Sequence, residues 1–424
     1  MFRTQKCVSP DLIKIKINHK NITKVMKKKI VIIGAGYAGA SLARLFNDQA
    51  QIIVLESAKR PGGLCKSYYK EGMVYEYGPH ILANHHCSDE AIAFILKHID
   101  CVETGLTSAS YVKGKFTYYP PHQKNAEILG IKEIVEEEWK NLPHIPNEEN
   151  FETYLIDKVG KTFYEIYFKD FTEKFWGIPP KTMSAEWAKM RHLGESLKDE
   201  KMFFNKRWCA YPKSDWNELF KNLLQGINVV YDALVSKVDL DKKEVILDSG
   251  TTISYDMLIS TMSIDKLFGY PYGKLKYSGY EIEPVILERD YYGEFNSKPI
   301  SMTYFPEKDH IQARITDYKS FQKKETLETY QGRTIITIEK PSHKQEFYPS
   351  NDSENAKLLE KYLELAATHK DVITFGRKGL YKYLTTDTTT EMALRLQKYF
   401  PDWQELNVAS RLDAYNIVRG NWNN

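Results

Sequence analysis

The chain has 424 residues, of which 42% are hydrophobic and 13% aromatic, and its net charge is +3. This length favours two or three domains, and the near balance of charge argues against nucleic acid as a partner. The five cysteines form no CxxC pair, so we expect a reducing, cytoplasmic setting and no metal site. No apolar run approaches the roughly 18 residues of a membrane helix, so we expect no membrane span.

Residues 1–28 are basic and weakly patterned, and we expect an N-terminal extension outside the fold. The most informative segment follows: an apolar run, residues 29–33, leads into Gly34, Gly36 and Gly39 and then into a helical pattern. This order predicts a strand, a tight turn and a helix of the dinucleotide-binding type. Gly34 allows the turn, Gly36 lets the backbone approach a pyrophosphate, and Gly39 lets the helix pack close to the strand. The helix N-terminus offers N–H groups to the phosphates.

A second apolar run, residues 52–55, ends in Glu56, seventeen residues after Gly39. An acidic residue at this place typically binds a ribose hydroxyl. The glycine pair Gly62–Gly63 comes directly after this strand. A family of flavoproteins has such a second glycine-rich turn beside the cofactor, whereas NAD-binding folds need none. The pair therefore indicates FAD rather than NAD.

Hydrophobic periodicity predicts the elements that follow. In chain order we expect a helix at 88–99, a strand or hairpin at 111–119, mostly helices at 125–200, strands at 228–235, 245–247 and 255–261 with a turn at 248–250, several short strands at 283–340, a helix at 353–368, a strand at 371–375 and a helix at 388–399.

These elements predict an α/β fold in three parts: a Rossmann-like FAD-binding domain, a helical insertion domain and an antiparallel β-sheet substrate domain. The FAD-binding domain is expected to be discontinuous. The ranges are 29–100, 228–262 and 370–410 for the FAD-binding domain, 125–200 for the helical domain with a mobile loop, and 101–124, 203–227 and 263–350 for the sheet domain.

Five separated segments occur in the order and rough spacing of motifs from one family, between about residues 29 and 399. They are Tyr77-Gly-Pro-His80-Ile81, Phe171-Thr-Glu-Lys-Phe-Trp176-Gly177, Ala313-Arg314-Ile315, Glu346-Phe-Tyr348-Pro349 and Gly376-Arg377-Lys-Gly-Leu-Tyr-Lys-Tyr383-Leu384. They resemble the YGxHIF, YTxKQWG, TRIIE, YYP and GRLxxYxYxDM motifs of the UDP-galactopyranose mutases.

The resemblance implies a flavin-dependent mutase that interconverts the pyranose and furanose forms of a nucleotide-activated sugar, for surface polysaccharide. In this family N5 of reduced flavin is thought to attack the anomeric carbon, the diphosphate leaves and returns, and no net redox change occurs. The protein then has to bind a diphosphate, for which arginine is well suited, and to offer an aromatic platform for the base. The expected partner is the nucleotide-sugar substrate, and whether the protein forms a homodimer is left open.

By motif position, the resemblance implies four catalytic residues: His80, Arg191, Arg314 and Arg377. His80 matches the histidine whose loop lies against the flavin, and Arg191 matches the arginine of the mobile loop that closes over the diphosphate. Arg314 and Arg377 match the other cationic positions. The remaining positions that the resemblance implies for the substrate are His122, Phe171, Trp176, Phe203, Glu339, Tyr348 and Tyr383. Those expected at the cofactor are Gly34, Gly36, Ala38, Gly39, Glu56, Ser57, Gly62, Gly63, Leu64, His80, Ile81, Val235, Arg377, Asp387, Thr388 and Thr389.

The chain departs from the family pattern around the sugar and the nucleotide. Ala83 stands for a second histidine, His122 for an asparagine, Thr385 for an aspartate, and residues 207–210 for an RYQG segment. These changes favour a nucleotide sugar other than UDP-galactose. Two alternatives remain open: a flavin oxidase or dehydrogenase of the amine-oxidase type, which shares both glycine turns, and a non-catalytic FAD-binding protein.

Overall fold

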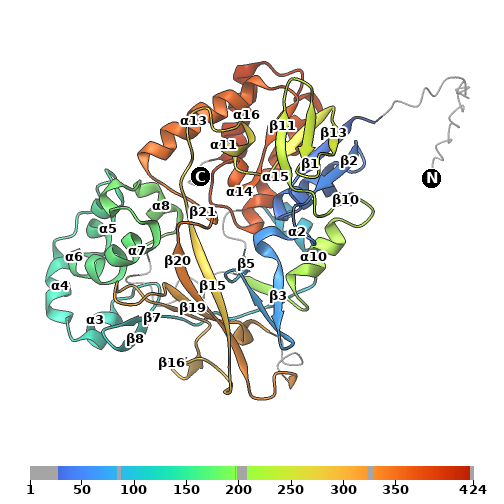
Figure 1. The fold of residues 1–424 in the computed structure, drawn as a ribbon. Helices are drawn as coiled ribbons and strands as arrows, with labels where there is room; N and C mark the ends of the chain where they lie inside the picture. The colour runs from blue at the N-terminus through green and yellow to red at the C-terminus, as the bar shows by residue number, and fades with distance from the viewer. Residues whose placement is uncertain (1–26, 84–86, 196, 198–207, 323–327, 421–424) are drawn as a thin grey trace, which may run out of the picture.

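The computed structural model of the chain describes residues 27–83, 87–195, 197, 208–322 and 328–420. Most of the predicted extension, together with Phe203 and Arg207, lies outside these residues. Figure 1 shows three parts: strands and helices at the upper right, a group of helices at the left, and long strands below and between them. Within the described ranges, no helix is both long and apolar enough to cross a lipid bilayer.

Strands β1 (Lys29–Ile33) and β2 (Gln51–Leu55), with helix α1 (Tyr37–Phe46) between them, form the predicted strand–turn–helix unit. The two strands pair in parallel within a five-stranded sheet of order β10-β2-β1-β14-β22, which confirms a Rossmann-like α/β fold. The sheet draws its strands from three distant stretches of the chain. The other three strands are β10 (Asn228–Val230), β14 (Met257–Ser260) and β22 (Val372–Thr374).

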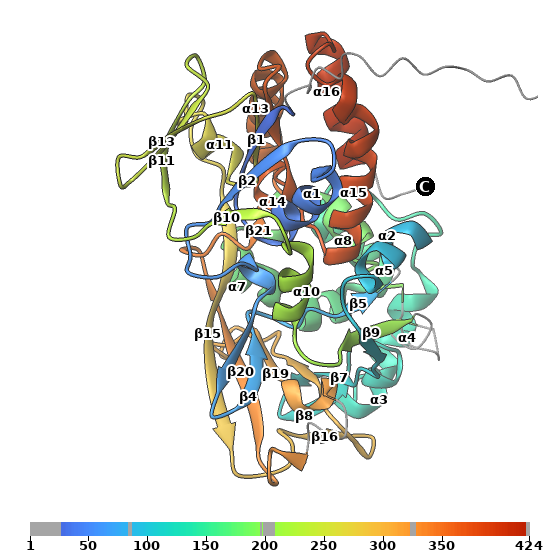
Figure 2. The same ribbon diagram turned by 90° about the vertical axis from the view of Figure 1, so that its right-hand side faces the viewer.

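Both faces of this sheet are buried, as is usual for parallel strands. Ile30 and Ile32 of β1 pack into a core shared with helices, whereas Val31 and Ile33 pack against a small antiparallel sheet. Figure 2 shows this layering, with β1 and β2 between the small sheet on one side and α15 and α16 on the other. These elements are β11 (Val235–Asp239), β12 (Glu244–Leu247), β13 (Thr252–Ser254), α15 (Thr386–Tyr399) and α16 (Val408–Arg419).

The prediction of a single strand at 228–235 is wrong, because β10 ends at Val230 and β11 begins at Val235. Between them Asp232 adopts a left-handed φ of 52°, and the N–H of Ala233 donates to the Glu56 carbonyl at 2.9 Å. Residues 231–234 therefore form a turn at the carboxyl end of β2. The hydrophobic pattern runs through this turn and hides it.

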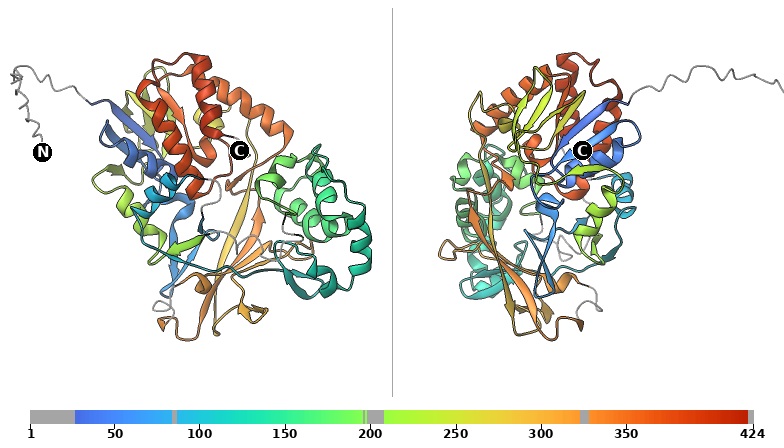
Figure 3. Two further views of the ribbon diagram at one scale, coloured as in Figure 1. Left: turned by 180° about the vertical axis from the view of Figure 1, so that it is seen from behind. Right: turned by 45° about the vertical axis from the view of Figure 1, so that its right-hand side comes forward.

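The region 125–200 is mostly helical in its described part, as predicted. Its helices enclose a separate core that contains Phe163, Tyr167 and Trp176. Figure 3 shows this helical part from behind, on the far side of the long strands from the Rossmann-like sheet. The helices are α3 (Lys124–Leu129), α4 (Lys132–Lys140), α5 (Phe151–Val159), α6 (Lys161–Tyr164), a π-helical turn η2 (Glu165–Lys169), α7 (Asp170–Trp176) and α8 (Ala185–Met190).

A seven-stranded sheet of order β21-β15-β20-β19-β18-β7-β8 joins the other two parts. The prediction of several short strands at 283–340 is partly wrong. The sheet is built on two long strands, β15 (Tyr277–Leu287) and β20 (Thr334–Ser342), which pair over nine positions. Gly114 lies in the hairpin between β7 and β8, as predicted. The other strands are β7 (Ser108–Val112), β8 (Lys115–Tyr118), β18 (Met302–Tyr304), β19 (Arg314–Asp317) and β21 (Tyr348–Pro349).

The remaining elements connect these parts. Helix α13 (Ser353–Thr368) has the predicted bounds, and the Asp352 side chain caps its first turn. The others are the hairpin β3 (Ser67–Lys70) and β4 (Met73–Glu76), the small sheet of β5 (Leu82–Ala83), β6 (Cys101–Glu103) and β9 (Cys209–Pro212), and helices η1 (Gly63–Cys65), α2 (Asp89–Leu96), α10 (Trp216–Leu223), α11 (Ile264–Leu267) and α14 (Gly376–Gly379).

Candidate functional site

A cavity of about 570 Å³ lies where the three parts of the fold meet. The two glycine turns line one end of it, and arginine and tyrosine side chains line another. Each predicted cofactor residue except Gly39 lines this cavity, as do Arg191, Arg314, Tyr348 and Tyr383 from the predicted catalytic and substrate sets. The structure thus brings together residues that the sequence separates by up to about 350 positions.

The two glycine turns form a close-packed cradle. Gly34 has a φ of +98°, and a Cβ on Gly39 would lie 1.9 Å from the Gly34 carbonyl oxygen. A Cβ on Gly63 would lie 3.1 Å from the Cα of Gly36, so the two turns contact each other directly. Gly39 therefore acts from behind the cavity, by letting α1 approach the turn. A cradle of bare backbone at a helix N-terminus suits a pyrophosphate.

Glu56 is a buried carboxylate at the carboxyl end of β2 and lines the cavity. Its Oε2 accepts the N–H of Ala35 at 2.8 Å, and its Oε1 accepts the N–H of Ala58 at 2.9 Å. A longer bond of 3.5 Å runs from the Ser57 hydroxyl to Oε1. These bonds fix the carboxylate and leave Oε2 with a lone pair for another donor. Its orientation therefore fits the ribose-binding role predicted from the sequence.

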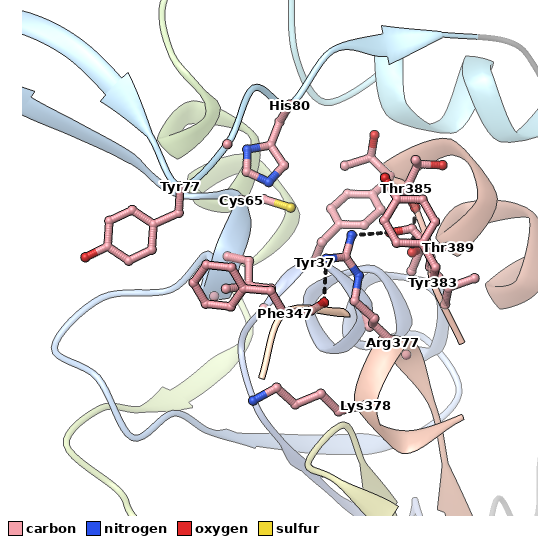
Figure 4. Close-up of a pocket in the computed structure, with 18 of the residues that line it drawn as sticks. Tyr37, Cys65, Tyr77, His80, Phe347, Arg377, Lys378, Tyr383, Thr385 and Thr389 are labelled. Carbon is pink, nitrogen blue, oxygen red and sulfur yellow. Dashed lines mark hydrogen bonds between the residues drawn. The ribbon is translucent and has the colours of Figure 1, made fainter. Parts of the chain in front are cut away.

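The first turn of α15 contributes Asp387, Thr388 and Thr389 to the cavity wall. Thr385 caps this helix, and the Thr388 hydroxyl accepts the Thr385 N–H at 2.8 Å. The pKa of the Asp387 carboxyl is raised, mainly because of its burial. Figure 4 shows Thr385 and Thr389 beside Arg377, at the opposite side of the cavity from His80 and Cys65.

Arg314 and Arg377 are held in place by acceptors around the cavity. The Nε and Nη2 atoms of Arg314 donate to Glu339 Oε2 at 2.9 and 2.5 Å. The Nη1 atom of Arg377 donates to the Phe347 carbonyl at 2.9 Å, and its Nη2 atom donates to the Leu384 carbonyl at 2.5 Å. Both guanidinium groups keep further N–H groups for a ligand, because a guanidinium has five donors.

Tyr348 and Tyr383 stack at 5.6 Å between ring centroids, and the Arg377 guanidinium lies 5.4 and 4.9 Å from the two rings. Arg191, exposed at the end of α8, lies 5.5 Å from the Tyr383 ring. Burial would raise the pKa of the Tyr383 hydroxyl, but Arg191, Arg377, Arg314 and His80 together hold it below its usual value. The field at this end of the cavity is therefore strongly positive and favours an anion.

The other residues predicted for the substrate lie behind the cavity wall. Glu339 is fully buried and positions Arg314, and Trp176 packs against Trp187, which in turn packs against Tyr383. Phe171 is half-buried, 6.4 Å from the ring of Tyr304. His122 is buried outside the cavity lining, and its Nδ1 accepts the N–H of Lys124. Phe203 lies outside the described residues.

Two residues that the sequence did not single out belong to the site. Tyr304 lines the cavity and stacks on Tyr119 with 3.7 Å between ring centroids. It lies on β18, within an ordinary strand pattern that gives no signal. Glu76 accepts two hydrogen bonds from His80, and its place four residues before this histidine was the available clue.

Comparisons with known proteins agree with this geometry. Residues 32–96 match the family model described as an NAD(P)-binding Rossmann-like domain, so fold and cavity together define a Rossmann-type dinucleotide-binding protein. Residues 166–383, just over half of the chain, match the model described as UDP-galactopyranose mutase. The chain belongs to the UDP-galactopyranose mutase family and is a mutase-like enzyme.

Individual relatives span nearly the whole chain. A probable UDP-galactopyranose mutase of Klebsiella pneumoniae is 24% identical over 390 residues, which cover 88% of this chain and 94% of that protein. A dTDP-fucopyranose mutase of Escherichia coli is 25% identical over 385 residues, covering 88% of this chain and 98% of that protein. A crystal structure of reduced UDP-galactopyranose mutase superposes with a TM-score of 0.74 at 18% identity and covers 93% of this chain and 98% of its own.

Proposed function

We propose that the protein is an FAD-dependent mutase that interconverts the pyranose and furanose forms of a nucleotide-linked sugar. The observation that carries this proposal is a group of three arginines in the same cavity as the glycine cradle. Arg191 and Arg377 lie against the stacked pair of tyrosines, and Arg314 lies 5.8 Å from the Tyr304 ring. A dinucleotide site and an anion site in one cavity fit a reaction in which a diphosphate leaves and returns beside a flavin.

The glycine turns, Glu56 and the first turn of α15 would hold FAD. The pyrophosphate fits the backbone cradle at the N-terminus of α1, and Glu56 keeps a lone pair on Oε2 for a ribose hydroxyl. When bound and reduced, FAD would supply the nucleophile for the anomeric carbon. With such a cofactor in place, the covalent chemistry would belong to the cofactor, and the chain would supply binding, orientation and charge.

The chain's own work is to bind and neutralise the diphosphate. Arg314 and Arg377 are already oriented by Glu339 and by backbone carbonyls, so little side-chain freedom is lost on binding. Within the described residues, the hydroxyl groups of Tyr348 and Tyr383 make no hydrogen bond, and both can donate to phosphate oxygens. Arg191 is exposed beside Tyr383, where it can close over the substrate. These charges favour departure of the diphosphate, because they stabilise the negative charge that develops on it.

The identity of the sugar is proposed from the lining of the cavity. Ala83 and Thr385 both line it and replace a histidine and an aspartate of the family pattern. The first change removes an imidazole and the second removes a carboxylate, and either group could bind a sugar hydroxyl. We therefore propose a deoxy- or amino-hexose in place of galactose, and the relative named dTDP-fucopyranose mutase supports such a substrate class.

The amine-oxidase alternative shares the glycine turns but needs no diphosphate clamp. The arginine and tyrosine cluster therefore favours the mutase, and it also argues against a non-catalytic FAD-binding protein. The test is to reduce the purified protein with dithionite and incubate it with a panel of nucleotide sugars. We expect furanose forms to appear by chromatography without stoichiometric use of oxygen or reductant. Turnover that consumes an electron acceptor would support the oxidase instead.

A further inference from the structure

The His80 side chain is tied to a buried carboxylate that no family motif predicted. Glu76 is fully buried at the end of β4. Its Oε2 accepts the backbone N–H of His80 at 2.9 Å and contacts His80 Nδ1 at 3.0 Å. Its Oε1 accepts the hydroxyl of Tyr211, and its carbonyl accepts the hydroxyl of Tyr318 at 2.9 Å. Within the described residues, Glu76 forms no ion pair with a lysine or arginine.

An isolated buried carboxylate is costly unless a cation or several donors compensate it. The only basic side chain that contacts Glu76 in the described part of the chain is His80, so a proton on this imidazole neutralises the pair. The geometry also fixes the ring, since Nδ1 faces Glu76. Figure 4 shows the Cys65 sulfur beside the other edge of the His80 ring.

His80 lies between the two ends of the cavity. It contacts Cys65, which follows the glycine pair on the cofactor side, and its charge acts on Tyr383 on the diphosphate side. A cation at this place stands where the bound cofactor and the substrate would meet. It is distinct from Arg191 and Arg377, which lie over the Tyr383 ring.

We propose that Glu76 is a positioning residue that holds His80 as an imidazolium ion with a fixed orientation, and that this ion stabilises the electron-rich reduced cofactor. Hydrogen-bond donors and charges that are oriented before reaction stabilise negative charge most effectively in a water-poor cavity. The second half of this inference rests on the proposed function, because it needs a flavin in the cavity. The first half concerns the chain alone.

The electrostatics of the described groups agree with this arrangement. Burial alone would lower the pKa of His80, but its interactions with the Cys65 side chain, the hydrogen bond that it donates to Glu76 and the negative charge of Glu76 raise it to about 10. The other groups that face His80 are Tyr383 and, beyond Gly78, the Arg314 guanidinium. Since the folded-state pKa lies above the unfolded value, the stabilising effect is complete below about pH 6.5 and is lost as the pH rises through about 10.

The first test is a histidine-selective NMR titration of the full chain as purified, with the His80 signal assigned from His80→Gln. We expect His80 to stay an imidazolium from pH 5.5 to 8.5 and to titrate within this window in Glu76→Gln. Tyr211→Phe is the matched control: it removes the other side-chain donor to Glu76 but keeps the carboxylate, so His80 should stay charged. A wild-type His80 that titrates near pH 6.5 overturns the proposal, whether or not Glu76→Gln folds.

Cys65→Ala separates the two neighbours of the ring. If His80 loses its charge in Cys65→Ala but keeps it in Glu76→Gln, Cys65 and not Glu76 keeps the imidazole protonated, and the assignment of Glu76 is wrong.

The second test is the midpoint potential of the bound flavin at pH 7. We expect a more negative potential in Glu76→Gln than in the wild type and in Tyr211→Phe. An equal potential in all three proteins would overturn the inference that the His80 imidazolium stabilises the reduced cofactor. Failure of the protein to bind flavin would contradict the proposed function, while the titration of His80 would still decide the first half.

Discussion

Arg314 and Glu339 are direct cross-strand partners in β19 and β20, and the guanidinium places two of its N–H groups on one carboxylate oxygen. The Thr316 hydroxyl donates to the other oxygen at 2.6 Å. The Glu339 side chain is fully buried and that of Arg314 is 12% exposed. This pair therefore orients the arginine from within the sheet and leaves its outer edge for a ligand.

Glu339→Gln should weaken this orientation without removing the arginine. The loss of the buried carboxylate leaves Arg314 with a neutral acceptor, so we expect about a tenfold fall in kcat/KM, which corresponds to roughly 1.4 kcal/mol. The unfolding temperature should fall as well, because a buried ion pair loses one partner. Thermal unfolding and steady-state kinetics would measure both effects.

The matched control for this change is Glu283→Gln, which removes an exposed ion pair with Lys340 on the same sheet. Exposed pairs contribute about 0–1 kcal/mol, so stability and turnover should stay close to wild type. Equal effects of the two substitutions would mean that Glu339 does not position Arg314.

Arg314→Ala and Arg377→Ala should each lose most activity while the FAD-binding fold stays intact. Charge-assisted hydrogen bonds contribute roughly 1.5–3 kcal/mol, so about one to two decades in kcat/KM is the expected minimum. Flavin content and circular dichroism would report the fold. Near-normal turnover in both variants would place the diphosphate elsewhere.

Lys174→Met should loosen the loop that leads into Arg314. The Lys174 ammonium donates to the backbone carbonyls of Phe305, Glu307, His310 and Gln312 at 2.7–3.1 Å. Without it the carbonyls of Phe305, His310 and Gln312 lose this donor, while the Glu307 carbonyl keeps the N–H of His310 at 3.3 Å. An unsatisfied buried group costs about 1–3 kcal/mol. We expect a lower unfolding temperature and faster hydrogen exchange at residues 305–313.

Lys169→Met provides the control for Lys174→Met. Lys169 is exposed in the turn η2 that precedes α7, so its removal tests the loss of a lysine from the same region. The unfolding temperature and the hydrogen-exchange rates of Lys169→Met should match those of the wild type. If both variants behave alike, the four carbonyl contacts do not hold the loop.

Gly39→Ala and Gly36→Ala should have different effects. A Cβ on Gly39 meets the Gly34 carbonyl oxygen at 1.9 Å, so α1 must move, and we expect a loss of stability of about 1–3 kcal/mol together with loss of cofactor. A Cβ on Gly36 meets its nearest described neighbour only at 3.7 Å, so the fold should persist. Its methyl group instead blocks the approach to the pyrophosphate, and FAD affinity should fall. Denaturant titration and flavin binding would separate the two outcomes.

UDP-galactose should be a poor substrate. Sites built to bind particular hydroxyl groups reject analogues strongly, so Ala83 and Thr385 should change which sugar is accepted. We expect another nucleotide sugar, a deoxy- or amino-hexose, to be preferred by at least about tenfold in kcat/KM, or roughly 1.4 kcal/mol. A side-by-side comparison by chromatography checks this, and a preference for UDP-galactose would show that the departures are compensated locally.

The sequence alone predicted those features that depend on residues close together in the chain. The glycine turns, Glu56 and the helix at 353–368 depend on backbone geometry, capping and periodicity within a few residues, and the structure has them where the sequence indicates. The arginine and tyrosine positions came from a family resemblance and not from their spacing. In the structure, Arg191, Arg314, Tyr348 and Tyr383 line one cavity with Arg377.

Only the tertiary structure decided which residues line the site and which support it. His122, Phe171, Trp176 and Glu339 have the polar or aromatic character of ligand-binding residues, yet they lie behind the wall. Tyr304 reaches the cavity because β18 pairs between β7 and β19, a long-range arrangement that no local pattern contains. Glu76 acts on His80 because a turn brings a buried strand end against the imidazole. Burial and distance between remote segments set these roles, and both arise only when the chain is folded.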